Sequence, residues 1–120
     1  MPDRPDTPFA VLYLHDGHEA AACATADILT MHGYTVHTAR PGEEWKQALA
    51  TFVPDCVLLE LPAGQATQVC RSLRNHAGCE RSRFIAVCDD GDEAALQGEG
   101  IARVLPSRAS TRELLRALRP

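Results

Sequence analysis

The residues of this chain that could do chemistry stand at, or just after, the ends of apolar runs. They are His15, Asp16, Glu60 and Cys88. A carboxylate, an imidazole and a thiol can each bind a metal ion or exchange a proton. In doubly wound α/β sheets, ligands gather beyond the carboxyl ends of the strands. If the apolar runs are parallel strands of one sheet, these four side chains belong to the edge where a site would form.

The stretch from Asp55 to Pro62 organises the rest of the chain. An unbroken apolar run at 56–59 ends in Glu60. Such a run is typical of a strand that is buried on both faces, as in the centre of a parallel sheet. Glu60 therefore stands at the carboxyl end of the predicted central strand.

These residue types suit two kinds of site. The four residue types suit zinc, but their spacing is not that of a zinc motif, and we predict no metal ion and no cofactor. Cys88 could be a redox sensor, but Asp89, Asp90 and Asp92 follow it. Nearby negative charge makes a thiol less reactive, which favours a packed structural residue.

Strands and helices alternate along the predicted fold. Strand patterns occupy 9–14, 34–39, 55–60, 84–87 and 101–105, and helix patterns occupy 19–31, 41–53, 65–74, 93–97 and 110–118. A polar turn is expected at 15–18, a loop at 62–64, and a left-handed helix end at Gly33. Ser110 and Glu113 have the spacing of a capping box.

Helical spacing also predicts which side chains face the core. These are Ala21, Thr25, Ile28 and Leu29 in the first helix; Trp45, Ala48, Leu49 and Phe52 in the second; Val69 and Leu73 in the third; and Leu114, Leu115 and Leu118 in the last. The alternation implies an α/β fold, with a doubly wound five-stranded parallel sheet of flavodoxin-like order 2-1-3-4-5. We expect one domain over 9–120, after a disordered, proline-rich lead-in at 1–8. The chain's end soon after the last helix suits a single-domain protein.

Composition narrows the classes of function. A net charge of −4 over 120 residues argues against nucleic-acid binding, and no apolar run approaches the length of a membrane span. The five cysteines lack CxxC spacing, which indicates mostly buried thiols and a cytoplasmic protein.

Two motifs point to a family. Residues 32–36 read His-Gly-Tyr-Thr-Val, and residues 54–59 read Pro-Asp-Cys-Val-Leu-Leu. With the spacing of the elements, they make the chain from Phe9 to Leu118 resemble the receiver domain of two-component response regulators. The resemblance implies a flavodoxin-like fold and a role in signal transduction, without enzymatic activity of its own.

The resemblance also implies positions for the family's functional residues, and most are changed here. The phosphoacceptor aspartate falls on Glu60, and the two acids after the first strand fall on His15 and Asp16. The switch positions fall on Cys88, Val104 and Ser107. Ser107 takes the place of the family's lysine, and Arg108 that of the proline after it.

These changes predict a degenerate, phosphorylation-independent receiver. His15 is a poor magnesium ligand, Glu60 reaches one methylene further than aspartate, and Ser107 carries no charge to balance a phosphoryl group. We expect the chain to act by binding a protein partner through a face that carries Arg112, Arg116 and Arg119, with a homodimer as a possibility. A solvated helix face explains the same arginines without a partner.

Four alternatives stay open. Glu60 can imitate a phosphorylated aspartate or be a remnant of a lost site. The chain can still respond to an acyl phosphate and magnesium through Asp16 and Glu60, or act as a ligand or redox sensor. Lastly, Asp16-Gly17-His18 is similar to the start of the motif of cobalamin-binding domains, in which His18 would be the cobalt ligand.

Overall fold

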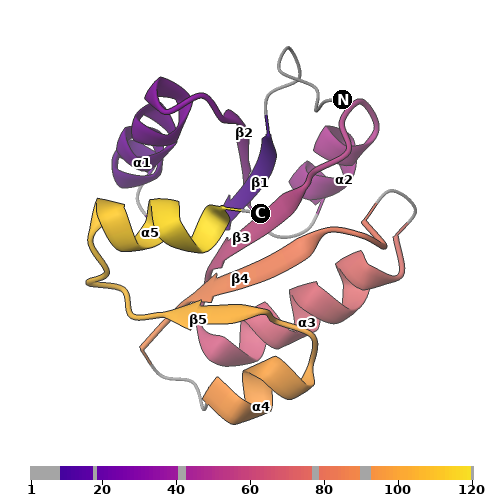
Figure 1. The fold of residues 1–120 in the computed structure, drawn as a ribbon. Helices are drawn as coiled ribbons and strands as arrows, with labels where there is room; N and C mark the ends of the chain where they lie inside the picture. Colours follow the sequence, from indigo (N-terminus) through magenta and orange to yellow (C-terminus); the bar gives the residue numbers. More distant parts are fainter. Residues whose placement is uncertain (1–8, 18, 41–42, 77–78, 90–92, 120) are drawn as a thin grey trace, which may run out of the picture.

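The computed structural model describes residues 9–17, 19–40, 43–76, 79–89 and 93–119. In this part of the chain five parallel strands form one sheet in the order β2-β1-β3-β4-β5, as Figure 1 shows. The strands are β1 (Ala10–His15), β2 (Thr35–Ala39), β3 (Cys56–Glu60), β4 (Arg83–Val87) and β5 (Arg103–Leu105). The predicted fold class and strand order are confirmed.

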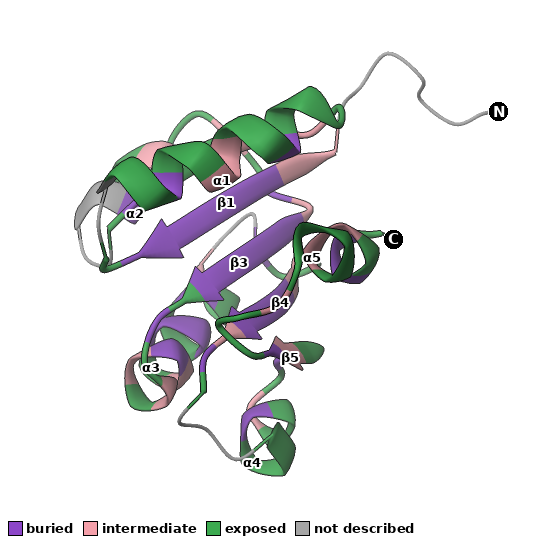
Figure 2. Cartoon of the chain, turned by 90° about the vertical axis from the view of Figure 1, so that its left-hand side faces the viewer, coloured by how far each residue is buried: buried purple, intermediate pink, exposed green. Residues whose placement is uncertain are grey.

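Helices cover both faces of the sheet. They are α1 (Glu19–Met31), α2 (Glu43–Leu49), α3 (Ala63–Arg74), α4 (Glu93–Gly98) and α5 (Thr111–Leu118). One core cluster joins the sheet to α2, α3 and α4, and a second joins it to α1 and α5. Figures 1 and 2 show the resulting three layers.

Strand β3 lies in the middle of the sheet and is buried on both sides, as its apolar run predicts. Val57 and Leu59 belong to the cluster beneath α2, α3 and α4, while Cys56 and Leu58 belong to the cluster beneath α1 and α5. None of the four side chains is more than 1% exposed. Alternation along a strand then turns the next residue, Glu60, toward the α1 and α5 side.

Strand β1 is one residue longer at its end than the sequence predicts. We expected a turn to begin at His15, but His15 is the last residue of β1 and pairs in register with Glu60 of β3. The expectation was wrong because a polar residue was read as the end of the strand. The ladder with β3 instead carries the strand to the same level as Glu60.

Helix α3 begins earlier than predicted. We expected a loop at 62–64, but the helix starts at Ala63, with Pro62 before it at φ −56°. The carbonyl of Pro62 accepts a hydrogen bond from the Ala66 N–H at 2.8 Å. Proline suits this place because its φ is already near helical and its missing N–H has no partner in the first turn. The connection after Glu60 is correspondingly short.

The buried face of α1 agrees with the prediction in part. Leu29 is buried, as predicted, and Thr25 is half-buried. Ala21 is exposed and Ile28 is 36% exposed, whereas Ala22, which was not predicted, is buried. Small, uniform alanines around 20–24 give little periodic contrast, and this made the face hard to assign from the sequence.

Smaller differences concern the ends of elements. Helix α2 stops at Leu49, and Phe52 packs partly buried beyond it; Trp45 is core, as predicted. β5 spans three residues, and Ile101 is buried before it. Val69, Leu73 and Leu118 are buried as predicted, while Leu114 and Leu115 are half-buried. Gly33 has φ +95°, and both hydrogen bonds of the Ser110–Glu113 capping box are present.

A polar cluster, here called the Glu99 clamp, ties the turn after α4 to α3. Arg71 donates two hydrogen bonds to the Glu99 carboxylate, at 2.8 and 2.7 Å, and Arg74 donates to the Glu99 carbonyl at 2.8 Å. Gly100 follows at φ +103°, a conformation that L side chains rarely adopt. Every polar group named here has a partner within the cluster.

In the described residues, no helix is long and apolar enough to cross a membrane.

Candidate functional site

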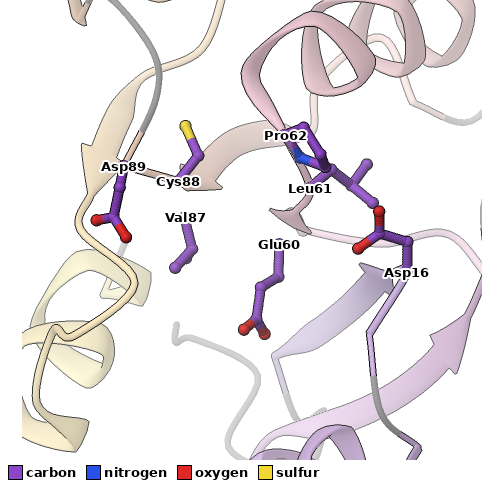
Figure 3. Close-up of a pocket in the computed structure, with 7 residues that line it drawn as sticks. All are labelled: Asp16, Glu60, Leu61, Pro62, Val87, Cys88 and Asp89. Atoms are coloured by element: carbon purple, nitrogen blue, oxygen red, sulfur yellow. The ribbon is translucent and has the colours of Figure 1, made fainter.

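The carboxyl edge of the sheet is hollowed above β3 and β4. The hollow, called here the edge hollow, has a volume of about 270 Å³. It is lined by Asp16, Glu60, Leu61, Pro62, Val87, Cys88 and Asp89, which Figure 3 shows. Of the predicted site residues, the structure brings Asp16, Glu60 and Cys88 to this one place.

Glu60 has a partner that the sequence did not reveal. The buried Tyr13 hydroxyl, from the middle of β1, donates a hydrogen bond to Glu60 Oε1. Burial and the neighbouring carboxylate both raise the pKa of Tyr13 above its ordinary value. A buried tyrosine hydroxyl needs a hydrogen-bond partner, and Tyr13 and Glu60 are diagonal neighbours on one face of the β1–β3 pair. That requirement was the signal that could have identified Tyr13.

His15 lies in a second, smaller hollow beside the first. This inner hollow of about 80 Å³ is lined by Tyr13, His15, Asp16, Gly17, Ala21, Ala22 and Glu60. His15 is 5% exposed, and its Nδ1 is buried without a hydrogen-bond partner among the described residues. Its ring centroid lies 5.7 Å from that of Tyr13. Asp16 and Glu60 line both hollows.

Ser107, for which the sequence resemblance predicts the place of the family's lysine, is hydrogen-bonded to Asp89 and not to Glu60. The Ser107 hydroxyl and backbone N–H both donate to the Asp89 carboxylate, the latter at 2.9 Å. These hydrogen bonds lower the pKa of Asp89. They tie the end of β4 to the loop before α5. In the sequence, Asp89 stands out only as a neighbour of Cys88, and nothing there indicates its pairing with Ser107.

Cys88 and Val104, the other two predicted switch positions, face the opposite side of the sheet from Glu60. Cys88 is 9% exposed and belongs, with the partly buried Val104, to the cluster beneath α2, α3 and α4. In Figure 3 the Cys88 sulfur and the Glu60 carboxylate point in opposite directions. The Cys88 N–H donates to the Leu105 carbonyl at 3.0 Å. All five cysteines are described; none forms a disulfide, and all but Cys23 are buried.

Two of the predicted partner-face arginines, Arg112 and Arg116, lie on α5, and the third, Arg119, follows its last residue. Arg112, Arg116 and Arg119 are exposed and, with Thr111 and Leu115, line a shallow groove of about 480 Å³. The carboxyl end of α5 is fixed by Arg83, which donates to the carbonyls of Ala117 and Arg119 at 3.0 and 2.6 Å. Arg83 therefore holds the end of the helix that carries the basic face in place against β4.

The cobalamin alternative rests on a residue that the structure does not describe. His18, its proposed cobalt ligand, lies outside the described residues. The other two residues of the motif, Asp16 and Gly17, both line the inner hollow.

Comparisons with known proteins place the fold. No model of a protein family matches the sequence, and no curated protein matches it. Solved structures do match. The chemotaxis protein CheY4 of Vibrio cholerae superimposes with a TM-score of 0.80 at 17% identity, over 93% of this chain and 97% of that one.

Two further similar structures are receiver domains. A signal receiver domain of a response regulator from Bermanella marisrubri gives a TM-score of 0.73 at 25% identity, over 91% of this chain and 93% of that one. The receiver domain of the sensor histidine kinase PA1611 from Pseudomonas aeruginosa gives 0.71 at 19% identity, over 93% and 95%. The chain thus has the fold of the signal receiver domains of response regulators.

The Pseudomonas structure has a magnesium ion coordinated in its active-site cleft. At the carboxyl edge of this chain, the side chain at the end of β1 is a histidine. Magnesium requires a near-octahedral set of oxygen ligands, whereas His15 presents an imidazole. Across the described ranges, no three His, Cys, Asp or Glu side chains come together so that they could hold one metal ion.

Proposed function

We propose that this chain is a receiver-like signalling module that works without phosphorylation, by binding a protein partner. The observation that carries the proposal is the arrangement around Glu60. Its carboxylate ends the central strand, where the resemblance places the phosphoacceptor, and it accepts a hydrogen bond from the buried Tyr13. The carboxylate is thus part of a fixed contact across β1 and β3.

The groups that would have to assist phosphoryl transfer also support the proposal. Such transfer depends on positioning and on neutralising the charge of the phosphoryl group. Ser107 replaces the family's lysine and is bound to Asp89, while no lysine or arginine is among the described residues that line the edge hollow. The edge therefore combines three carboxylates, of Asp16, Glu60 and Asp89, and would repel a phosphoryl donor.

The proposed partner surface is the basic face of α5. Arg112, Arg116 and Arg119 present three positive charges around the half-buried Leu115. Arginines around an apolar contact are typical of protein interfaces, and this face suits an acidic surface of a partner or of a second copy of the chain. The absence of an enzymatic activity is part of the same proposal.

The test is thermal melting of the purified protein with and without magnesium and beryllofluoride, an analogue of the phosphoryl group. We expect no change in Tm. A ligand of the folded state at about 100 times its Kd would add about 2.7 kcal/mol, which raises Tm by several degrees. Such a rise would show that the edge still holds an oxyanion with its metal, and the proposal would be wrong.

The variant Glu60→Asp tests whether the glutamate itself or the residues around it prevent phosphorylation. We expect this variant to remain unlabelled by acetyl phosphate, because His15 and Ser107 are unchanged. Labelling of Glu60→Asp would mean that the extra methylene of glutamate alone prevents phosphorylation.

A further inference from the structure

We propose that a third hollow, between the sheet and helices α1 and α5, binds a small neutral alcohol with a body of about four carbon atoms. This α1–α5 hollow has a volume of about 90 Å³. Six apolar side chains line it: Leu58, Val87, Leu105, Pro106, Ala109 and Leu114. The inference goes beyond the proposed function and does not depend on it, since it concerns neither phosphorylation nor the basic face of α5.

The first argument is that the core is open at this place. Helices α1 and α5 cover the same face of the sheet, as Figures 1 and 2 show. Leu58 and Leu105 are buried members of the cluster beneath these helices, whereas Val87, Ala109 and Leu114 are only partly buried against it. Protein interiors contain few voids larger than a water molecule, so an unfilled apolar space beside the core favours binding of an apolar body.

The second argument is a hydrogen-bond acceptor at the polar end of the hollow. Tyr13, Thr25, Glu60 and Ser107 supply its polar groups. The Tyr13 hydroxyl donates to Oε1 of Glu60, and this contact holds the carboxylate on the α1 and α5 side of the sheet. Among the described residues no second donor binds this carboxylate, so Oε2 keeps its capacity to accept. A single donor group on a ligand can therefore pair with Oε2.

The third argument is the polarity of the lining, which favours a neutral ligand. Glu60 is the only charged residue among the described residues that line the hollow. An anion would be repelled by Glu60, and a cation would lose much of its hydration among the apolar side chains for the sake of one carboxylate. A hydroxyl group costs much less to desolvate, and its O–H donates to a carboxylate in a short, charge-assisted hydrogen bond.

The volume of the hollow sets the size of the ligand. An engineered apolar cavity of about 150 Å³ holds benzene, with its six non-hydrogen atoms, so about 90 Å³ suits about four carbon atoms. The hydroxyl group then lies outside the apolar part of the hollow, at the exposed Glu60. Isobutanol, a branched four-carbon alcohol with its hydroxyl at one end, has this shape and serves as the probe.

The experiment is an NMR titration with isobutanol of protein that carries ¹³C in the methyl groups of leucine and valine. We expect saturable shifts at the leucines and the valine that line the hollow. Leu73, which is buried on the other side of the sheet, should not shift. Shifts of equal size at Leu73 would indicate a general effect of the alcohol on the fold and would overturn the proposal. The absence of saturable shifts in the hollow would overturn it as well.

Isopropyl methyl ether is the matched control ligand. It is a constitutional isomer of isobutanol that accepts hydrogen bonds but has no group to donate. We expect the ether to bind about tenfold more weakly or worse, because the hydrogen bond to the Glu60 carboxylate is lost. Equal affinities of the alcohol and the ether would mean that no acceptor takes part in binding, and the proposal would be wrong.

Variants that fill the hollow locate the binding. Ala109→Leu and Thr25→Leu each place a larger apolar side chain at a half-buried residue of the lining, and each is expected to weaken isobutanol binding by about tenfold or more. Two variants are used so that one that fails to fold does not decide the outcome. Ala48→Leu is the matched control, since Ala48 is half-buried in α2 on the opposite side of the sheet. Equal weakening by this control, or unchanged binding in both filling variants, would overturn the proposal.

A last pair of variants tests the acceptor. Glu60→Met removes both carboxylate oxygens and keeps a side chain of similar length, so isobutanol and its ether should then bind about equally. Glu60→Gln keeps one oxygen that can accept a hydrogen bond, so part of the preference for isobutanol should remain. An undiminished preference in both variants would show that another group receives the hydroxyl, which would contradict the proposal.

Discussion

Two polar clusters of this molecule use similar residue types in opposite ways. In the Glu99 clamp, Arg71 takes both oxygens of the Glu99 carboxylate and Arg74 takes its carbonyl. At the carboxyl edge of the sheet, Asp16 has no hydrogen bond to another described side chain, and the Nδ1 of His15 is unpaired. A saturated cluster has its binding capacity used within the fold, whereas an unsaturated one keeps capacity for something outside it.

The difference suggests how to separate structural from functional polar residues in this chain. Changes in the Glu99 clamp should alter the free energy of unfolding. Changes at Asp16, an exposed acid at the carboxyl edge, should leave the free energy of unfolding nearly unchanged, since surface charges contribute little to stability.

Gly100→Ala is expected to have the largest effect. A methyl group at Gly100 would lie 2.5 Å from Arg74 Nη1, and the residue has φ +103°. We expect a loss of about 1 to 3 kcal/mol in the free energy of unfolding, measured by urea denaturation. The matched control is Gly98→Ala, since Gly98 lies within α4 with open space around its Cα. Its stability should stay the same or rise by up to about 1 kcal/mol. Equal losses in both variants would mean that the clamp does not hold the turn.

Tyr13→Phe should have the next largest effect, about 1 kcal/mol, because it removes the hydrogen bond to Glu60. The effect depends on pH. Since the pKa of Tyr13 is raised in the folded protein, its stabilising contribution is present below pH 10 and is lost as the pH rises further. Burial also raises the pKa of Cys56, to about 12. The unchanged protein and the Tyr13→Phe variant therefore both lose stability as the pH rises above about 9. Only the difference in stability between these two proteins reports on Tyr13.

The control for this variant is Tyr34→Phe. Tyr34 is half-buried and packs edge-to-face on Phe9 at 5.6 Å, and its hydroxyl has no hydrogen bond within the described part of the chain. The Tyr34→Phe variant should leave both the free energy of unfolding and its pH dependence nearly unchanged. If Tyr13→Phe behaves like this control, the contact with Glu60 does not contribute to folding.

The smallest expected effects are changes in the pKa values of one carboxylate from each cluster, Asp89 and Glu99. Hydrogen bonds from Ser107 lower the pKa of Asp89, and Arg71 lowers the pKa of Glu99. Both carboxylates therefore stabilise the fold at neutral pH, and this contribution is lost as the pH falls through their pKa values. NMR titration should show the pKa of Asp89 rising toward 3.8 in Ser107→Ala, while Glu99 stays unchanged. In Arg71→Gln the pKa of Glu99 should rise toward 4.5 while Asp89 stays unchanged. Coupled changes would show that the two clusters are not independent.

The sequence was sufficient for the fold because its signals are local. Alternating strand and helix patterns, an unbroken apolar run at β3 and a capping box before α5 each depend on neighbours in the chain. The order of the sheet then follows from general rules for parallel connections. The end of β1 was misjudged because it depends on pairing with β3, which lies 45 residues further on at His15 and Glu60.

The site was harder to predict for the same reason. The position of Glu60 at the end of β3 follows from the local pattern, but its contact with Tyr13 joins residues 47 apart, and that of Ser107 with Asp89 joins residues 18 apart. Such pairs require the register of neighbouring strands and the direction of each side chain. Residue type alone indicated the edge of the sheet and not which of its polar groups are already bound to one another.

The two outermost strands of the sheet, β2 and β5, differ in a way that bears on aggregation. Edge strands offer unpaired backbone groups to which another chain can add. At one edge β5 is three residues long and exposes Arg103, so few such groups are offered and a charge stands among them. At the other edge β2 is five residues long, and the side chains of His37 and Thr38 are exposed. Under conditions that loosen the fold, intermolecular strand addition should therefore begin at β2, and a lysine placed at Thr38 should slow it.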